Sequence, residues 1–438
     1  MSKPIGLFDA YGIEIELMIV EKTSLNVSSS ADLLLTAAAG KLVSDFEDGP
    51  ITWSNELVNH VLEFKTTGPA KSLIPLEMQF FESQQHASRL LNAMGLRLMP
   101  TGMHPWMNPL TETQLWAHDN NEIYDLYNKI FDCRGHGWSN LQSVHINLPF
   151  ANESEFNRLH SAVRLILPLI PALSASSPFA DGQASGQLDS RLAFYETNQS
   201  RFPVIAGEII PDSVSGFDDY RNKITNPIQR SISPYDPDGI LVGDWLNSRG
   251  AIARIDRGTI EIRLLDTQEC AHADLILVQF VTTLVQAVCE RADLLEKSDR
   301  LTTNRLHAIY QSCVRSAENA PIYDAAFLSA FALNQPLSTH ALLRHLLSDL
   351  VEPFLNKREN TAVARTLIRS FNEALGAKSL ATRILQAVRS RTGSSTAPSR
   401  AHLMSVYGDL CLCLDENRVF TSSVSREVLT SNVSLKTE

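Results

Sequence analysis

Apolar and polar residues alternate in several short stretches of the N-terminal part of the chain, which predicts β-strands. The alternation is clearest in Gly12–Val20, where isoleucine or leucine occupies every second position. Asn59–Thr67 and Leu141–Pro149 show shorter versions of the same pattern. Ala251–Leu265 holds two such runs on either side of Asp256-Arg257-Gly258, a turn sequence, so we predict a hairpin there.

Two helical patterns lie between these strands, at Pro75–Met94 and Glu153–Leu173. A parallel sheet would need strands and helices in regular alternation, and this chain does not show that order. We therefore expect an α+β fold in which the sheet is antiparallel or mixed and is backed by helices.

The pattern changes to a helical period after Ala271. The predicted helices of this part are Leu275–Ser298, Ser338–Val351, Asn360–Leu375, Lys378–Arg391 and Ala401–Leu414. Ser338 is the expected N-cap of the second, and Pro353 is expected to stop it. These patterns divide the chain into a sheet region at 1–270, a helical region at 271–425 and a flexible tail at 426–438. The helical region either forms part of the same domain or packs beside it.

The composition is that of a globular protein. Of the 438 residues, 44% are hydrophobic and 20% are charged, and the formal net charge is −11. This apolar content is enough for a core and excludes a chain that is disordered throughout. The acidic balance disfavours a nucleic-acid partner, because phosphate binding needs a basic surface.

The N-terminus and the cysteines favour a cytoplasmic location. The sequence MSKPIGLFDAYG lacks the apolar core of a secretory signal. The longest apolar stretches, Ala162–Ala175 and Ala273–Cys289, are too short or too polar to span a bilayer, so we expect buried helices and no membrane partner. The six cysteines show no CxxC spacing, which argues against a structural zinc site and for reduced thiols.

Glu14 and Glu16 are the first candidates for chemistry. They are two residues apart on a predicted strand, so both point to the same face. Two neighbouring carboxylates repel one another, and a divalent cation such as Mg²⁺ or Mn²⁺ relieves that repulsion. The alternative is an ordinary amphipathic strand with a solvated acidic face.

The other predicted strands repeat this arrangement, with two polar groups on one face and apolar groups on the other. The pairs are Glu63 with Lys65, His145 with Asn147, and Glu261 with Arg263. Carboxylates beside an arginine suit a metal–triphosphate site. The sequence has neither GxxxxGK[ST] nor GxGxxG, so a nucleotide would be bound through a carboxylate-held metal and arginines.

Five motifs, in this order, resemble the glutamate–cysteine ligase family, including its bacterial carboxylate–amine ligase branch. They are G-I-E-I-E at Gly12–Glu16, E…LE-F-K-T from Glu56 to Thr66, V-H-I-N at Val144–Asn147, SASSPFADGQASG at Ser174–Gly186, and I-E-I-R-L-L-D at Ile260–Asp266. Together they cover roughly residues 10–270. The chain departs from the branch at Ser143, where its carboxylate–amine ligases commonly have histidine.

This resemblance implies a glutamine-synthetase-like fold, in which a curved antiparallel sheet forms an open funnel backed by helices. It also implies ATP-dependent coupling of a carboxylate to an amine through an acyl phosphate. The typical reaction joins the γ-carboxylate of glutamate to cysteine, a step of glutathione biosynthesis. No residue of this chain is assigned to cysteine binding, so the amine stays open.

The resemblance also implies roles for individual residues. The expected ligands of Mg²⁺, with Mn²⁺ as the alternative, are Glu14, Glu16, Glu63, His145 and Glu261. Arg263 and Glu261 are the catalytic candidates, with Arg263 on the γ-phosphate of ATP and Arg254 and Arg249 as further phosphate contacts. Arg191, Arg201 and Asn147 are the candidates for binding substrate, because a guanidinium matches a carboxylate. The alternative for the four arginines other than Arg263 is pairing with acidic groups of the protein.

Three rival functions remain open at this point. One is a ligase that uses another amine or carboxylate. The second is a phosphotransferase, since guanidino kinases share this general fold, and the third is a non-catalytic ATP-binding protein. The expected partners are ATP and amino acids. The helices after Ala271 either form a homodimer face or cover the sheet.

Overall fold

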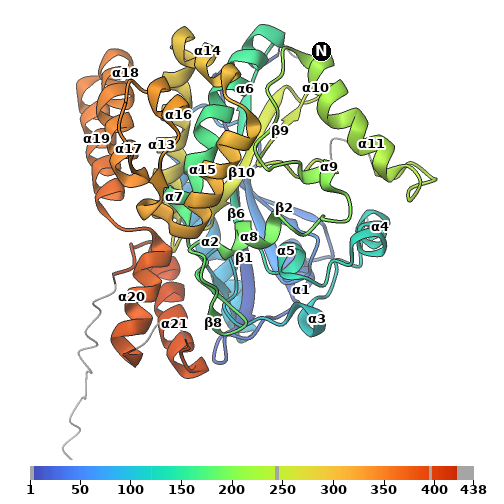
Figure 1. Cartoon of the computed structure of the whole chain (residues 1–438). Helices are drawn as coiled ribbons and strands as arrows, with labels where there is room; N and C mark the ends of the chain where they lie inside the picture. The colour runs from blue at the N-terminus through green and yellow to red at the C-terminus, as the bar shows by residue number, and fades with distance from the viewer. Residues whose placement is uncertain (1–3, 120, 242–245, 394–396, 422–438) are drawn as a thin grey trace, which may run out of the picture.

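The computed structural model describes residues 4–119, 121–241, 246–393 and 397–421. The predicted flexible tail at 426–438 lies outside these residues. The fold is α+β, with an antiparallel sheet backed by helices (Figure 1), as the sequence predicts.

Eight strands of the described chain form one sheet, and every pair of neighbours is antiparallel. Their order is β2 (Asp45–Asp48), β3 (Ile51–Asn55), β4 (Val61–Thr66), β1 (Gly12–Glu21), β6 (Ser143–Pro149), β10 (Thr259–Asp266) and β9 (Ala251–Arg254), and β5 (Leu96–Met99) pairs with the second half of β1. β1 therefore lies at the centre, between β4 and β6. The predicted strands and the β9–β10 hairpin are confirmed.

One face of the sheet is apolar and buried. Ile13, Ile15, Leu17 and Ile19 of β1 have no exposed surface and belong to the main hydrophobic core. In the described chain, the helices against this face include α2 (Leu76–Ala93), α6 (Glu153–Ile166) and α13 (Ala271–Cys289). Burial of this apolar surface drives the sheet and the helices together, and it leaves the opposite face for the charged side chains.

Three strands of the sheet were not predicted: β2, β3 and β5. The reason is their length. β2 and β5 have four residues each and β3 has five, so each holds only one or two repeats of the apolar–polar alternation, too few to mark a strand in the sequence. The helical pattern at Glu153–Leu173 is divided into α6, η1 (Leu167–Leu169) and α7 (Ile170–Ser174), because two prolines interrupt it.

The C-terminal part is helical, as predicted. Its main helices are α13, α14 (Ala292–Arg300), α15 (Thr303–Ser316), α16 (Ala325–Ala330), α17 (Thr339–Leu346), η4 (Leu347–Val351), α18 (Glu352–Arg358), α19 (Thr361–Gly376), α20 (Leu380–Thr392) and α21 (Arg400–Glu416). Ser338 caps α17 by accepting a hydrogen bond from the backbone N–H of Ala341. The expectation that Pro353 stops this helix was wrong. Pro353 occupies the first turn of α18, where its missing N–H is tolerated.

α13 is long and apolar enough to cross a membrane by length and composition alone. However, 72% of its most apolar window is buried inside the protein, as expected for a core helix. All six cysteines are buried and none forms a disulfide.

Short elements make up most of the connections. They are α1 (Ala31–Ala39), α3 (Pro109–Glu112), α4 (Asn121–Phe131), α5 (His136–Ser139), β7 (Phe179–Ala180), β8 (Gln183–Ala184), α8 (Ser190–Tyr195), α9 (Pro203–Ala206), α10 (Phe217–Tyr220), η2 (Arg221–Thr225), α11 (Asn226–Ile232), η3 (Ala317–Asn319), β11 (Pro321–Ile322) and β12 (Leu337–Ser338). Of these, α4, α5 and α8 contribute to the site described next.

Candidate functional site

The register of the central strands brings the predicted polar residues together on one face. Glu14 lies opposite His145, Glu16 lies opposite Glu63, and Glu261 lies opposite Asn147. Because side chains alternate between the two faces of a strand, these six point away from the covered apolar face. Four strands that are far apart in sequence thus build one acidic surface.

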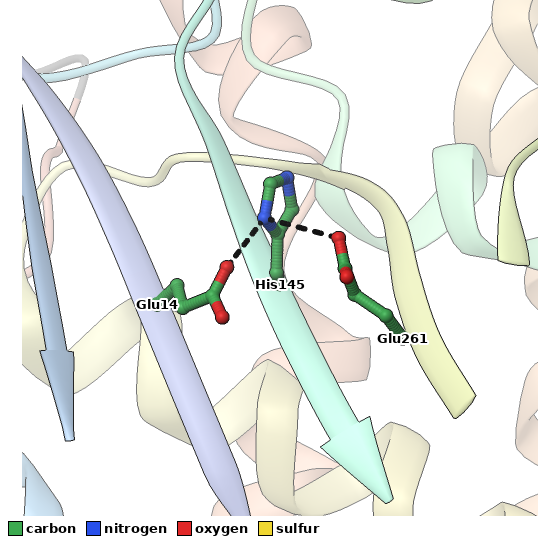
Figure 2. Close-up of side chains that lie close together, drawn as sticks. All are labelled: Glu14, His145 and Glu261. Atoms are coloured by element: carbon green, nitrogen blue, oxygen red, sulfur yellow. Dashed lines mark hydrogen bonds and ion pairs between the residues drawn. The ribbon is translucent and has the colours of Figure 1, made fainter. Parts of the chain in front are cut away.

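Glu14, His145 and Glu261 form the closest cluster on this surface (Figure 2). His145 Nδ1 is 2.9 Å from Glu14 Oε2 and 3.8 Å from Glu261 Oε1. One ligand atom from each residue lies within 4.8 Å of the others. Two carboxylates and an imidazole, converging from three adjacent strands, fit a divalent cation such as Mg²⁺ or Mn²⁺.

Glu16 is held by Ser143, the position at which the chain departs from the related motif. Ser143 donates to Glu16 Oε2 from its backbone N–H at 2.8 Å and from its Oγ at 2.9 Å. The same Oγ is 2.9 Å from His145 Nε2. Ser143 therefore orients both a predicted carboxylate ligand and the imidazole, a role that sequence reasoning did not assign to it.

The pKa values of two buried carboxyl groups of the site, those of Glu63 and Glu56, are raised above the ordinary value. Burial raises the pKa of Glu63, and the charges of Glu14 and Glu56 raise it further, although Lys65 lies 3.0 Å from its Oε2. Burial also raises the pKa of Glu56 to about 7, with the charge of Glu16 adding to the effect. Buried carboxylates this close together favour a bound cation, which is the second observation in line with a metal site.

Two arginines lie beside Glu261. Arg263 Nε is 2.6 Å from Glu261 Oε1, and Arg254 Nε is 3.1 Å from Oε2. Burial by itself raises the pKa of Glu261, but the two guanidinium groups outweigh it and lower the pKa to about 2. Glu261 is therefore ionised, and both arginines line the space in front of this face of the sheet.

That space is a cavity of about 450 Å³. Glu16, Glu56, His145, Arg254 and Arg263 line it. Its other lining residues include an apolar and aromatic group that the sequence did not reveal: Leu57, Val58, Ile123, Tyr124, Tyr127 and Trp138. Most of these come from α4, α5 and the loop before β4, where nothing in the sequence pattern marks them. The charged lining residues Glu16, Glu56, His145 and Arg263, by contrast, all belong to the five motifs.

Arg191 lines the cavity, and its guanidinium group also forms an ion pair with Asp266. Its Nε donates to Asp266 Oδ1 at 2.5 Å, and both side chains are buried. Its Nη2 is buried and has no hydrogen-bond partner among the described residues. One part of this guanidinium therefore serves the fold, and another part is left for a ligand.

Three other predicted contacts lie differently. Arg249 is buried against the backbone carbonyls of Val204 and Ile205 and does not line the cavity. Arg201 is exposed, stacks over Phe202 and Tyr235, and donates to the backbone carbonyl of Ile130. Asn147 donates to Glu14 Oε1 at 2.9 Å and so positions a carboxylate.

Comparison with known proteins identifies the family. Residues 10–326 match the model of glutamate-cysteine ligase family 2 (GCS2). The chain belongs to this family. An uncharacterized protein of Archaeoglobus fulgidus is 34% identical over 275 residues, which cover 62% of this chain and 73% of that protein.

Solved structures agree with this fold. A glutamate–cysteine ligase of Francisella tularensis, solved in complex with AMP, is 12% identical with a TM-score of 0.58, covering 96% of this chain and 91% of that chain. A bifunctional glutathione synthetase of Pasteurella multocida is 13% identical with a TM-score of 0.60, covering 94% of this chain and 53% of that chain. The predicted family and fold class are confirmed, and the chain is an ATP-dependent ligase of the glutamate–cysteine ligase family.

Proposed function

We propose that this ligase joins the γ-carboxylate of glutamate to the amino group of a second substrate, with cysteine as the first candidate. One observation carries the proposal: the Glu14–His145–Glu261 cluster lies directly beside Arg254 and Arg263, and His145 and both arginines line one cavity. A site that activates a carboxylate with ATP needs metal ligands and phosphate-binding cations next to each other.

Glu14, His145 and Glu261 are the residues that would hold Mg²⁺ or Mn²⁺, with Glu16 and Glu63 beside them. When bound, such an ion neutralises phosphate oxygens and makes the terminal phosphoryl group easier to attack. Ser143 and Asn147 keep the carboxylates in place through the hydrogen bonds described above.

The reaction begins with ATP because a carboxylate is a poor electrophile. A carboxylate oxygen of glutamate attacks the γ-phosphorus, the bond to the β-phosphate oxygen breaks, and an acyl phosphate and ADP result. Arg263 and Arg254 face the transferred group and stabilise the charge that develops on its oxygens. The amine then attacks the acyl carbon, loses a proton, and expels inorganic phosphate.

The reaction also requires that a substrate carboxylate is bound and that water is kept from the acyl phosphate, and other residues of the cavity wall suit these two tasks. The unpartnered Nη2 of Arg191 is a donor for a substrate carboxylate. Tyr127 and Trp138, among the aromatic side chains of the wall, limit the access of water to the acyl phosphate. We assign Arg249 and Arg201 no contact with substrate, because neither lines the cavity.

The proposal also covers the pathway, the location and the oligomeric state of the enzyme. With cysteine as the amine, the product is γ-glutamylcysteine, the precursor needed for glutathione biosynthesis. We propose a cytoplasmic enzyme with amino acids and ATP as its ligands. We also propose that the enzyme forms a homodimer through its C-terminal helices.

Product analysis of the full chain tests the function. The protein is incubated with ATP, Mg²⁺ and glutamate, with cysteine or one of a panel of other amines, and the products are analysed by mass spectrometry. We expect ADP, phosphate and a γ-glutamyl amide in equal amounts. A phosphorylated substrate without released phosphate would make the protein a phosphotransferase, and ATP binding without turnover would make it a non-catalytic relative.

A matched pair of variants ties the activity to the site. Glu261→Gln keeps the shape of the side chain but removes its charge, so we expect turnover to fall by about 100-fold or more. Glu82→Gln changes an exposed glutamate of α2 and should leave turnover unchanged. Far-UV circular dichroism of both variants checks the fold. Equal turnover in the two variants would contradict the site assignment.

A further inference from the structure

A second cavity, of about 200 Å³, lies where α7, α13, α17 and α19 meet the start of α20. It shares no lining residue with the ligase cavity. Its apolar walls include Leu173, Ile276, Leu343 and Leu375. The ligase mechanism uses none of these side chains.

Two buried glutamates line this cavity, and each has an oxygen without a partner. Glu269 has no exposed surface, and its Oε1 accepts from Arg383 Nη1 at 2.6 Å and from the backbone N–H of Phe420 at 3.0 Å. Glu318 is 9% exposed, and its Oε1 accepts from Thr382 Oγ1 at 2.8 Å. In the described part of the chain, no group donates to Oε2 of either glutamate.

An unpartnered buried carboxylate oxygen is unfavourable, and a donor supplied by a ligand removes that penalty. The glutamates do not fit a metal. Among the described residues, the cluster whose ligand atoms converge closely enough for an ion is that of Glu14, His145 and Glu261. A positively charged ammonium group, with three donors, meets the need of two separate carboxylate oxygens better.

The opposite charge is also present in the cavity wall. Arg383 donates from its Nε to the backbone carbonyl of Lys378 and from its Nη1 to Glu269 and to the backbone carbonyl of Phe420, whereas its Nη2 donates to no group of the described chain. Lys378 lines the same cavity. A ligand with a carboxylate beside its ammonium group would therefore find a partner for each charge, and an aliphatic side chain would find the leucines.

We propose that this cavity is a second amino-acid site, which binds a small zwitterion with an aliphatic side chain outside the ligase cavity. The unpartnered Oε2 atoms of Glu269 and Glu318 receive the ammonium group. Arg383 receives the carboxylate. The site needs neither ATP nor a metal, so its existence is independent of the reaction proposed above.

Isothermal titration calorimetry of the full chain, without ATP or metal, tests the site. The probes are glutamate, alanine, valine and leucine, together with isobutylamine, which lacks the carboxylate, and isovalerate, which lacks the amine. We expect an aliphatic amino acid to bind at least tenfold more tightly than either single-charge analogue. Binding of no amino acid, or equal binding of an analogue, would overturn the proposal.

Two variants locate the binding. Glu318→Gln removes one charge while its amide oxygen can still accept from Thr382, and we expect affinity to fall about tenfold, as for a lost charged hydrogen bond. Ser370→Trp fills the cavity from a half-buried position of α19, without removing a core side chain, and should abolish binding. The unfolding midpoint of each variant without ligand shows that it is folded.

Two controls separate this site from the ligase cavity. Glu82→Gln should leave the affinity unchanged, and so should Glu261→Gln, which alters only the proposed ligase site. Loss of amino-acid binding in Glu261→Gln together with normal binding in Ser370→Trp would place the ligand in the ligase cavity and overturn the second site. That outcome would leave the proposed reaction intact.

Discussion

Arg191 and Asp266 form a buried ion pair, with Arg191 Nε 2.5 Å from Asp266 Oδ1. Asp266 also accepts from the backbone N–H of Ser176 at 2.9 Å and from Ser177 Oγ at 2.8 Å. Asp266 ends β10, the strand that carries Glu261. The pair therefore ties the SASSPF segment and α8 to the strand that supplies the catalytic candidates.

Replacing Asp266 should destabilise the whole protein. Asp266→Ala leaves the guanidinium of Arg191 buried without its counter-charge, and we expect the free energy of unfolding to fall by about 3–5 kcal/mol. Urea denaturation measures the change. Asp218→Ala is the control, because the Asp218 side chain is 92% exposed, and it should change stability by no more than about 0.5 kcal/mol. A similar small effect at Asp266 would contradict the anchoring role.

Gly102 should tolerate no side chain, because Asp266 occupies the space. A Cβ added at Gly102 would lie 2.7 Å from Asp266 Oδ1 and closer still to its Cγ. We expect Gly102→Ala to lower the free energy of unfolding by about 1–3 kcal/mol through this overlap. Gly68→Ala is the matched control, since a Cβ there would meet nothing within 4 Å. Thermal and urea unfolding of both variants give the comparison.

His160 should make the stability of the protein depend on pH. Its ring is buried between Phe156 and Tyr220, and burial, helped by the charge of Arg164, lowers its pKa to about 3. In the unfolded chain the ordinary value is about 6.5. Between these values the unfolded chain binds a proton that the folded chain does not, so stability is full above pH 6.5 and is lost as the pH falls.

The variant His160→Leu removes this proton uptake. Between pH 7.5 and pH 5, the free energy of unfolding of the wild type should fall by about 2 kcal/mol more than that of the variant. Urea denaturation at several pH values gives both slopes. Parallel slopes would show that His160 titrates alike in the folded and unfolded chain.

Removal of divalent metal should abolish the reaction without unfolding the protein. We expect EDTA to stop ADP formation, and Mg²⁺ or Mn²⁺ to restore it, because Glu14, His145 and Glu261 converge on one point. Binding is measured separately: Mn²⁺ should raise the unfolding midpoint of the wild type. The same ion should leave the midpoint of His145→Ala unchanged, and an equal rise in that variant would exclude the cluster as the metal site.

Several features of the site followed from local patterns. In β1, apolar residues at every second position show that Glu14 and Glu16 share a face, because the alternation of side chains is a property of each strand alone. For the same reason, His145 and Asn147, two residues apart on β6, were predicted to share a face. Family motifs then placed these strands in one known fold, which the comparisons confirm.

Local patterns were therefore enough to predict the main strands, the fold class and the acidic face, since a two-residue period needs only neighbouring residues. Which strands lie side by side, and which partner each long side chain meets, depends on the packing of the whole chain. Arg191 meets Asp266 across 75 positions of sequence, and Arg249 ends among backbone carbonyls and does not line the cavity of the predicted phosphate contacts. The packing of distant segments sets such contacts, and no local pattern records them.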